Sequence, residues 1–342
     1  MTMEYVKQNK ILSGVLIIIV VIIGFFVIRN TIDDNLAAVG TASDKLVTVR
    51  FGDLPVVDAL PLYLAIEKGY FEEVGINAER IKIDSPNLII DALLSGKIDI
   101  TSPSGAMGIA GVATTKKPES LQIYMASGGD EINTTDSLLV KINSHINSVK
   151  DIKNGMSLGI LPGIQWRTIA RHIIASYGLE VGRDITLVEL VPGLQATALD
   201  SGQIDILLAI EPIPTIVKAK NIGREIVRTP TIVIASPFYP GAGIVRSEFV
   251  QKNPEIMKKI VAVYEKSLEE IWEDPMEAKK YLSGYTPLDD SLIFEVPIPL
   301  WSLSKNFTEK DIEAIEDFHQ IFSTYAVVES PIQTRDILYS SK

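Results

Sequence analysis

Polar, glycine and aromatic residues recur in this sequence where apolar, strand-like stretches end and helices begin. An open α/β sheet binds its ligands at such places, because the helix starts expose unpaired backbone N–H groups and the positive end of the helix dipole. These residue types bind a small solute through hydrogen bonds and require no covalent step. Our candidate ligand-binding residues are therefore Asp53, Ser85, Asn87, Ser102, Ser104, Gly105, Ser127, Gly163, Gln165, Trp166, Gln195 and Glu211.

Each candidate also has a structural alternative. Serine and asparagine at a helix start are common caps, which hold the first turn without touching a ligand. Capping and binding are compatible, since a small anion can share the same N–H groups. The indole ring of Trp166 either forms a wall of the pocket or packs in the core or on the surface.

The sequence supplies no catalytic or metal-binding motif. It contains no cysteine, which excludes disulfides, thiolate metal sites and cysteine nucleophiles. His145, His172 and His319 have no histidine partner at i, i+4 for a metal, so we interpret them as structural. No G-x-S-x-G, H-E-x-x-H or phosphate-loop pattern occurs. We expect a binding protein without catalytic residues, metal or cofactor.

The composition indicates a folded protein that does not bind nucleic acid. The chain has 342 residues, of which 46% are hydrophobic, enough for one large or two ordinary globular domains. Its formal net charge of −11 opposes non-specific binding to phosphate backbones. We therefore expect no nucleic acid among its partners.

The segments that must position the candidates alternate between strand and helix patterns, and the alternation occurs twice. The first series predicts strands at 46–54, 77–84, 97–101 and 121–127, with helices at 60–75, 86–96 and 104–115. The second predicts strands at 137–142, 156–162, 185–191 and 204–210, with helices at 165–178, 194–202 and 212–220. Long amphipathic helices follow at 253–275 and 308–328. This order predicts an α/β fold of two lobes, each a mixed, mostly parallel sheet flanked by helices.

Both series contain nearly the same segment, ALLSGKIDI at 92–100 and ALDSGQIDI at 198–206. In each copy a glycine, Gly96 or Gly202, can take the left-handed conformation that ends a helix, and a short strand follows. A helix-to-strand connector that arose twice is one explanation. The other is a pair of similar lobes that face each other across a cleft. Two glycine-containing stretches would then be the crossings that form a hinge, GGDEINTTD at 128–136 and SPFYPGAG at 236–243.

Residues 11–28 form an uncharged apolar stretch of the minimum length for a membrane-spanning helix. Lysines precede it, and Arg29 with two aspartates follows, which favours an N-terminus in the cytoplasm. A cleaved signal peptide is the alternative, because NLAAVGTAS supplies small residues at plausible cleavage positions. We expect a single-pass protein of the cell membrane with a cytoplasmic tail at 1–10, an anchor at 11–28, a linker at 29–45 and an extracytoplasmic remainder.

Four stretches, taken in order, carry family information. They are LAIEKGYFEEVGINAE (64–79), ALLSGKIDI (92–100), ALDSGQIDI (198–206) followed by Glu211-Pro212, and VRSEFVQKNPE (245–255). Together they resemble the extracytoplasmic solute-binding proteins of ABC importers, in the group for nitrate, sulfonates, taurine and thiamine precursors. The resemblance covers nearly all of 46–342.

The resemblance implies the type II periplasmic-binding-protein fold, with lobe 1 formed by 46–135 and 245–342 and lobe 2 by 136–244. It also implies a receptor that closes over a small organic or anionic solute of the sulfonate or taurine, nitrate or thiamine-precursor class. Such a receptor delivers its solute to an ABC permease and the ATPase subunit of that permease. A solute that contacts both lobes favours the closed state through its differential affinity.

Two alternatives of function stay open. One is an enzyme on the same scaffold related to thiamine-pyrimidine synthesis, although the chain lacks the cysteine-rich motif of those synthases. The other is a membrane-tethered solute sensor. Glu211 matches the acidic-proline step of the family, where it can orient pocket groups, accept a hydrogen bond from a ligand amine or join a basic neighbour. An unpaired Glu211 carboxylate in the cleft would disfavour a bare anion such as nitrate and would suit a zwitterion or a neutral heterocycle.

Overall fold

The structure is a computed structural model in which residues 46–340 are described. The chain from Val47 onward forms one compact unit. The expected cytoplasmic tail, membrane anchor and linker, at 1–45, lie outside the described residues. Among the helices of 46–340, none is both long enough and apolar enough to cross a membrane.

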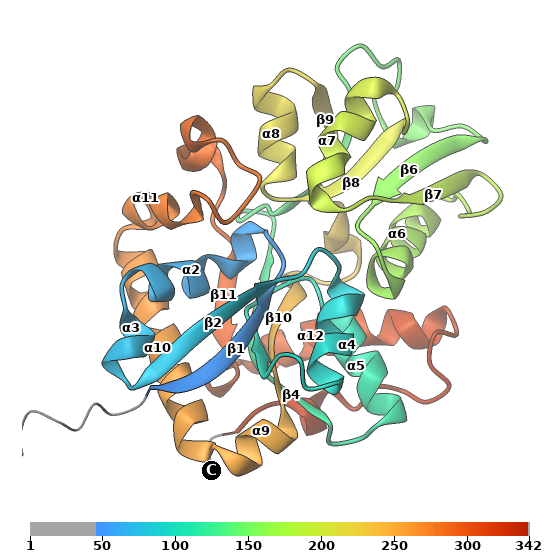
Figure 1. The fold of residues 1–342 in the computed structure, drawn as a ribbon. Coiled ribbons are helices and arrows are strands. Elements are labelled where there is room, and N and C mark those ends of the chain that lie inside the picture. The colour runs from blue at the N-terminus through green and yellow to red at the C-terminus, as the bar shows by residue number, and fades with distance from the viewer. Residues whose placement is uncertain (1–45, 341–342) are drawn as a thin grey trace, which may run out of the picture. The chain divides into compact units, whose positions relative to one another are not determined.

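Two β-sheets form the framework (Figure 1). Sheet A has the strand order β11-β4-β10-β3-β1-β2. Its strands are β1 (Val47–Asp53), β2 (Ile76–Lys82), β3 (Ile100–Thr101), β4 (Leu121–Gly129), β10 (Phe238–Arg246) and β11 (Leu300–Leu303). Sheet B has the order β7-β6-β8-β5-β9. Its strands are β5 (Asp136–Lys141), β6 (Met156–Ile160), β7 (Ile185–Glu189), β8 (Ile206–Ile210) and β9 (Gly223–Arg228). The predicted α/β architecture with two sheets is confirmed.

Both sheets are mixed, as predicted, and most strands of each run in one direction, with β10 and β11 opposed in sheet A and β5 opposed in sheet B. In sheet A, β1 is parallel to β2 and β3, whereas β10 is antiparallel to β3 and β4, and β11 is antiparallel to β4. In sheet B, β6 is parallel to β7 and β8, whereas β5 is antiparallel to β8 and β9. Parallel neighbours need a crossover connection on their own sheet. Strands β5 and β10 arrive directly from the other sheet instead, and both run antiparallel to their neighbours.

The chain passes between the sheets twice. The first crossing, 130–135, joins β4 to β5, and the second, 229–237, joins β9 to β10 and contains the 3-10 helix η3 (Pro230–Val233). The hydroxyl of Thr231 in η3 donates to the carboxylate of Asp136, the first residue of β5, at 2.9 Å. The two crossings are therefore tied to each other at the point where the first one enters sheet B.

The stretch 236–243, expected to be the return crossing, is mostly strand. Strand β10 begins at Phe238 and pairs with β4, so residues 238–244, expected in lobe 2, belong to sheet A. Glycine and proline are uncommon in strand interiors, which hides this strand from a reading of local pattern. The glycine at 243 has a packing reason, because a Cβ there would lie only 2.6 Å from Tyr124 Cζ.

Helices cover both faces of each sheet (Figure 1). The α-helices in the described part are α2 (Leu60–Glu67), α3 (Tyr70–Glu73), α4 (Pro86–Leu94), α5 (Met107–Lys116), α6 (Ile164–Ser176), α7 (Pro192–Ser201), α8 (Ile213–Ala219), α9 (Ser247–Lys252), α10 (Pro254–Glu273), α11 (Pro275–Ala278) and α12 (Glu309–Thr324). Helices α4, α5, α6 and α12 contribute to one buried apolar cluster, and α2, α7, α8 and α10 to the other. Strand residues alternate between the clusters, as the pleat requires: Leu138 and Val140 join the first, Leu139 the second.

The repeated segment ends α4 and α7 in the same way. Gly96 has a φ of +74° and Gly202 a φ of +77°, which confirms the predicted left-handed conformation. In both copies the N–H of the following residue donates to the carbonyl five positions back, at 2.9 Å. Strands β3 and β8 then pair in parallel with β1 and β6. The two copies therefore occupy equivalent places in the two sheets.

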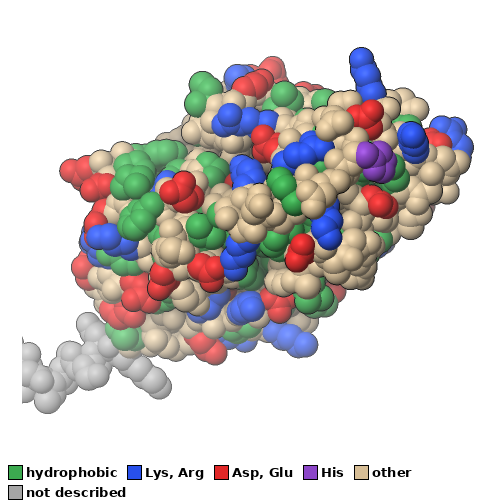
Figure 2. Space-filling view, turned by 90° about the horizontal axis from the view of Figure 1, so that it is seen from above, with side chains coloured by type: hydrophobic (Ala, Val, Ile, Leu, Met, Phe, Trp, Pro, Cys, Tyr) green, Lys and Arg blue, Asp and Glu red, His purple; other side chains and the backbone are tan. Residues whose placement is uncertain are grey.

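Acidic and basic side chains are interspersed on the face that Figure 2 shows, rather than gathered in one basic patch. Elsewhere in the described residues, charged side chains form ion pairs along helices, such as Lys252 with Glu248, four residues apart, at 2.5 Å. Exposed pairs of this kind contribute little to stability. The mixed charge offers a phosphate backbone no continuous basic track on this face.

Candidate functional site

The start of α5 is a point where elements of the two sheets meet. Its N-cap residue, Ala106, makes no side-chain cap for the first turn. Instead, the side-chain oxygen of Gln165 on α6 accepts the N–H of Gly108 at 2.8 Å and the N–H of Ile109 at 3.4 Å. The amide nitrogen of Gln165 donates to the carbonyl of Pro240 on β10 at 3.0 Å. Helix α6, which follows a strand of sheet B, is thereby bonded to two elements associated with sheet A.

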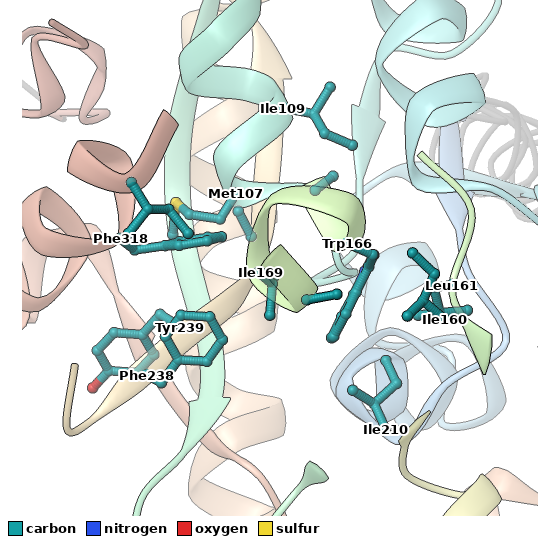
Figure 3. Close-up of a cluster of buried hydrophobic side chains, with 14 of the residues drawn as sticks. Met107, Ile109, Ile160, Leu161, Trp166, Ile169, Ile210, Phe238, Tyr239 and Phe318 are labelled. Carbon is teal, nitrogen blue, oxygen red and sulfur yellow. The ribbon is translucent and has the colours of Figure 1, made fainter. Parts of the chain in front are cut away.

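Trp166 lies beside this contact and is fully buried. Figure 3 shows its ring on α6, directed toward Leu161 and Ile210. The indole Nε1 lies against Gly105, where a Cβ would be 3.2 Å away, and it has no hydrogen-bond partner. A buried donor without a partner costs free energy, so an acceptor that entered here would be stabilising. Trp166 therefore packs in the core and also presents an unused donor.

Gly163 precedes α6 with a φ of +109°, a conformation that other residues rarely adopt. A Cβ on Gly163 would clash with the side-chain amide of Asn87, in the first turn of α4. The Oδ1 atom of Asn87 is buried and has no hydrogen-bond partner. The structure thus brings together five of the candidates predicted from the sequence, which we call the junction site: Asn87, Gly105, Gly163, Gln165 and Trp166.

Asp53 ends β1, but its carboxylate is already paired. It lies 2.9 Å from the guanidinium of Arg80 on β2 and accepts the hydroxyl of Tyr63 at 2.7 Å. The guanidinium lies over the rings of Tyr63 and Tyr285, 5.3 Å and 4.8 Å from their centroids. Burial raises the pKa of Asp53, and the hydrogen bond from Arg80 opposes that shift. The charge of Asp53 is therefore balanced inside the protein rather than offered to a solute.

The candidate serines of sheet A, Ser102, Ser104 and Ser127, are fully buried. The hydroxyl of Ser104 donates to the carbonyl of Ser102 at 3.2 Å, and that of Ser127 to the carboxylate of Asp58 at 2.6 Å. Sequence reasoning missed Asp58, whose pKa burial raises. The sequence did contain a signal for Asp58, because it is the only charged residue in the apolar segment LPVVDALPL (54–62).

The remaining candidates are Ser85, Gln195 and Glu211, and the hydrogen bonds of the last two lie within their own segments. Ser85 precedes α4 without capping it through its side chain. The amide nitrogen of Gln195 donates to the carbonyl of Leu190 at 3.1 Å. Glu211 follows β8, and its carboxyl accepts the N–H of Thr215 at 3.2 Å. Burial raises the pKa of Glu211 to about 7.

A hollow of about 370 Å³ lies between the start of α7 and residues near sheet A. Its lining consists of Pro55, Arg80, Lys82, Asp84, Val191, Gly193, Leu194 and 284–287. The sequence analysis did not name these residues as candidates. A signal for Gly193 was available, because PNLIIDALLSGKIDI (86–100) and PGLQATALDSGQIDI (192–206) align without a gap, and this alignment pairs Asn87 with Gly193. A Cβ on Gly193 would meet nothing within 4 Å. The same repeat position therefore carries a packed amide in α4 and borders open space in α7.

The described residues contain no group of three or more His, Asp or Glu that could hold a metal ion. The buried ring of His319 lies 2.7 Å from the hydroxyl of Thr334, and burial lowers its pKa to about 4. Its imidazole is therefore neutral at physiological pH. The ring of His172 packs edge-on against Tyr325, with 6.1 Å between the centroids.

Known binding proteins resemble this chain in sequence and in fold. The putative aliphatic sulfonates-binding protein of Bacillus subtilis (strain 168) is 23% identical over 284 residues, which are 81% of this chain and 82% of that protein. The alkanesulfonate-binding protein SsuA of Xanthomonas axonopodis pv. citri, bound to MOPS, has a TM-score of 0.71 at 15% identity, over 86% of this chain and 99% of that one. The periplasmic nitrate-binding protein NrtA of Synechocystis PCC 6803 has a TM-score of 0.66 at 16% identity, over 86% and 85%.

These relatives are named as binding proteins, not as enzymes. They confirm both the resemblance to sulfonate- and nitrate-binding proteins and the periplasmic-binding-protein fold that it implies. The sequence model of the NMT1-like family matches residues 42–281, well over half of the 342 residues. The chain therefore belongs to the NMT1-like family.

Proposed function

We propose that this protein is the extracytoplasmic receptor of an ABC importer and binds a small organic or anionic solute at the junction site. One observation carries the proposal: the buried indole N–H of Trp166 has no partner and lies against Gly105, two residues before α5, whose first turn exposes the N–H groups that Gln165 now accepts. An anion satisfies such donors, and the positive end of the α5 dipole favours it. The names of the relatives, for sulfonates and nitrate, support the same solute class.

Within that class we propose sulfonates and taurine first, with nitrate and thiamine precursors as the other members. Glu211 does not argue against an anion, because its carboxyl accepts the N–H of Thr215 and its pKa of about 7 leaves it largely uncharged in mildly acidic solution. Asp53 does not argue against an anion either, since Arg80 balances its charge.

Binding at the junction site couples a solute to the arrangement of the two sheets. Asn87 and Gly105 belong to segments around sheet A, whereas Gln165 and Trp166 belong to α6. A solute that contacts both sets stabilises the closed arrangement by its differential affinity, which a permease can read without any covalent step. We take sheet A with its helices as lobe 1, sheet B with its helices as lobe 2, and 130–135 with 229–237 as the hinge.

We further propose that residues 11–28 span the cell membrane, with 1–10 in the cytoplasm. The linker 29–45 then spans at most about 60 Å when fully extended, at about 3.5 Å per residue. This length holds the receptor within reach of a permease in the same membrane. Retention of the full chain in the membrane fraction after an alkaline wash is the expected result. Release of a shortened chain would instead indicate a cleaved signal peptide.

The experiment that tests the binding proposal is a thermal-shift screen of the purified full-length chain in detergent. The panel contains alkanesulfonates, taurine, nitrate, bicarbonate and thiamine-pyrimidine compounds. A solute at a hundred times its Kd stabilises the folded state by about 2.7 kcal/mol, which raises the Tm by several degrees. We expect a rise with a sulfonate-class solute. Absence of any rise, with no heat of binding by calorimetry, would overturn the proposed solute class.

A further inference from the structure

Gln165 occupies the position at the start of α5 that we assign to a solute oxygen. Its side chain is fully buried, and its Oε1 atom accepts the N–H groups of Gly108 and Ile109. A helix start normally finds such an acceptor in its own N-cap side chain, but Ala106 supplies none. The first turn of α5 is therefore capped from α6, across the boundary between the two sheets.

The other end of the same amide is also bonded across that boundary. Its Nε2 atom donates to the carbonyl of Pro240 on β10, a strand of sheet A. One side chain of α6 thus satisfies three backbone groups that belong to sheet A and its helix α5. If α6 moved away from these elements, all three bonds would break together, and water would have to replace them.

We propose that Gln165 is an internal latch, which takes the place of a solute oxygen and holds the closed arrangement when no solute is bound. The identity of the group that displaces it rests on the proposed function. The latch itself does not, because all of its contacts are internal. A sulfonate or carboxylate oxygen would have to displace the amide oxygen to bond the same N–H groups.

Apolar packing holds α6 in place as well. Trp166 and Ile169 share a buried cluster with Met107 and Phe318 (Figure 3). Such packing is not directional, whereas the Gln165 amide requires its partners at hydrogen-bond distance. Without that amide, the three backbone groups have no hydrogen-bond partner in the closed arrangement, whereas in the open arrangement they bond to water. Loss of the latch should therefore shift the equilibrium toward the open state without unfolding the protein.

Because the chain contains no cysteine, spin labels attach only at two cysteines that are introduced, and the distance between these labels can be measured directly. Lys97 and Gln203 are exposed and occupy equivalent repeat positions beside the two sheets. We would place spin labels at Lys97→Cys and Gln203→Cys in the full-length chain in detergent, without added solute, and measure their distance distribution. The same pair would be measured with Gln165→Ala, Gln165→Met and Gln195→Ala.

Gln165→Met keeps the length of the side chain and removes its hydrogen bonds. Gln195→Ala is the control, because it removes a buried amide whose hydrogen bond, to the carbonyl of Leu190, stays on the side of sheet B. We expect the unaltered chain to give one short distance. Both variants of Gln165 should raise the ratio of open to closed protein by about tenfold or more, the effect of leaving buried polar groups unpaired. Gln195→Ala should leave the distribution unchanged.

Amide hydrogen exchange of the segment 105–112 gives a second readout, which should become faster in both Gln165 variants and stay the same in Gln195→Ala. An open distribution in the unaltered chain would overturn the latch. A shift with Gln165→Ala but not with Gln165→Met would also overturn it, because lost volume rather than lost hydrogen bonds would then be the cause. Since no solute is present, failure of this test leaves the proposed function untouched, and failure of the solute screen leaves the latch untouched.

Discussion

Asp99 and Asp205 occupy the same position in the two copies of the repeat, and each carboxylate accepts the backbone N–H of a residue in the neighbouring parallel strand or at its start. Asp99 accepts from Arg50 in β1 at 3.1 Å, and Asp205 accepts from Ser157 in β6 at 2.8 Å. Two candidate ligand-binding residues lie at the carboxyl ends of these strands, since Asp53 is the last residue of β1 and Gly163 follows β6. The shared S-G-x-I-D sequence therefore sets the register of one parallel strand pair in each sheet, which is a structural role.

The two aspartates should differ in their contribution to stability. Asp99 is 6% exposed and also bonds the guanidinium groups of Arg50 and Arg246, whereas Asp205 is exposed. We expect Asp99→Asn to reduce the free energy of unfolding by about 3 kcal/mol and Asp205→Asn by about 1 kcal/mol. Urea unfolding measures both. Equal losses would contradict the unequal burial of the two carboxylates.

The pair of Asp53 and Arg80 should matter for folding more than for solute binding. Removing one partner of a buried pair leaves an uncompensated charge, so Asp53→Asn should cost about 3 kcal/mol of unfolding free energy. Asp84→Asn is the matched control, because the exposed pair of Lys82 and Asp84, at 3.3 Å, is worth less than about 1 kcal/mol. A fall in solute affinity without a fall in stability for Asp53→Asn would show that Asp53 serves the solute directly.

Stability should depend on pH through Glu211. Burial raises its pKa from 4.5 to about 7 in the folded protein, so the linked stability is complete below 4.5 and is lost as the pH rises through 7. We expect this loss to be on the order of 3 kcal/mol between about pH 4.5 and about pH 8. Denaturant unfolding across that range should show a smaller pH dependence for Glu211→Gln than for the unaltered chain.

Part of the pH dependence should remain in that variant, because burial also raises the pKa of Asp136 to about 7. Glu72→Gln, a change at an exposed glutamate, is the control and should leave the curve unchanged. Identical slopes for Glu211→Gln and Glu72→Gln would exclude Glu211 as a source of the effect.

Gly163 should be irreplaceable for two separable reasons. Gly163→Ala adds both a strained φ of +109° and a clash with the amide of Asn87, and we expect a loss of about 3 kcal/mol. Gly178→Ala, at a φ of +78° with nothing within 4 Å, isolates the strain and should cost about 1 kcal/mol. The double change Gly163→Ala with Asn87→Ala should recover part of the difference. Purely additive losses in the double variant would exclude the clash.

Trp166 should contribute to solute binding through its N–H group. Trp166→Phe keeps an aromatic ring in the buried site but removes the unpaired Nε1 donor. If the solute accepts from this donor, its affinity should fall about tenfold, the value of a hydrogen bond to a charged group. Calorimetric titration with the solute found in the screen measures the change. The exposed Trp272→Phe is the control, and equal affinities for the two variants would remove Trp166 from the list of solute contacts.

Local pattern was enough to predict much of this protein. The order of strands and helices from β1 to α8, the left-handed glycines that end α4 and α7, and the family all follow from short stretches of sequence, whereas β9, β10 and β11 were not predicted. These features depend on residues within a few positions of each other, such as the alternation of apolar residues in a strand or a glycine at a helix end. The sequence also excluded thiol chemistry outright, because it contains no cysteine.

Tertiary structure decided which candidates meet and which are already occupied. Gln165 bonds Gly108 across 57 positions of the chain, and Asp53 pairs with Arg80 across 27, so no local pattern connects either pair. The direction of β5 and β10 likewise depends on the sheet from which each strand arrives. Side chains far apart in sequence bond only where packing sets their elements at a particular angle and distance, and that arrangement depends on the summed contacts of both buried clusters.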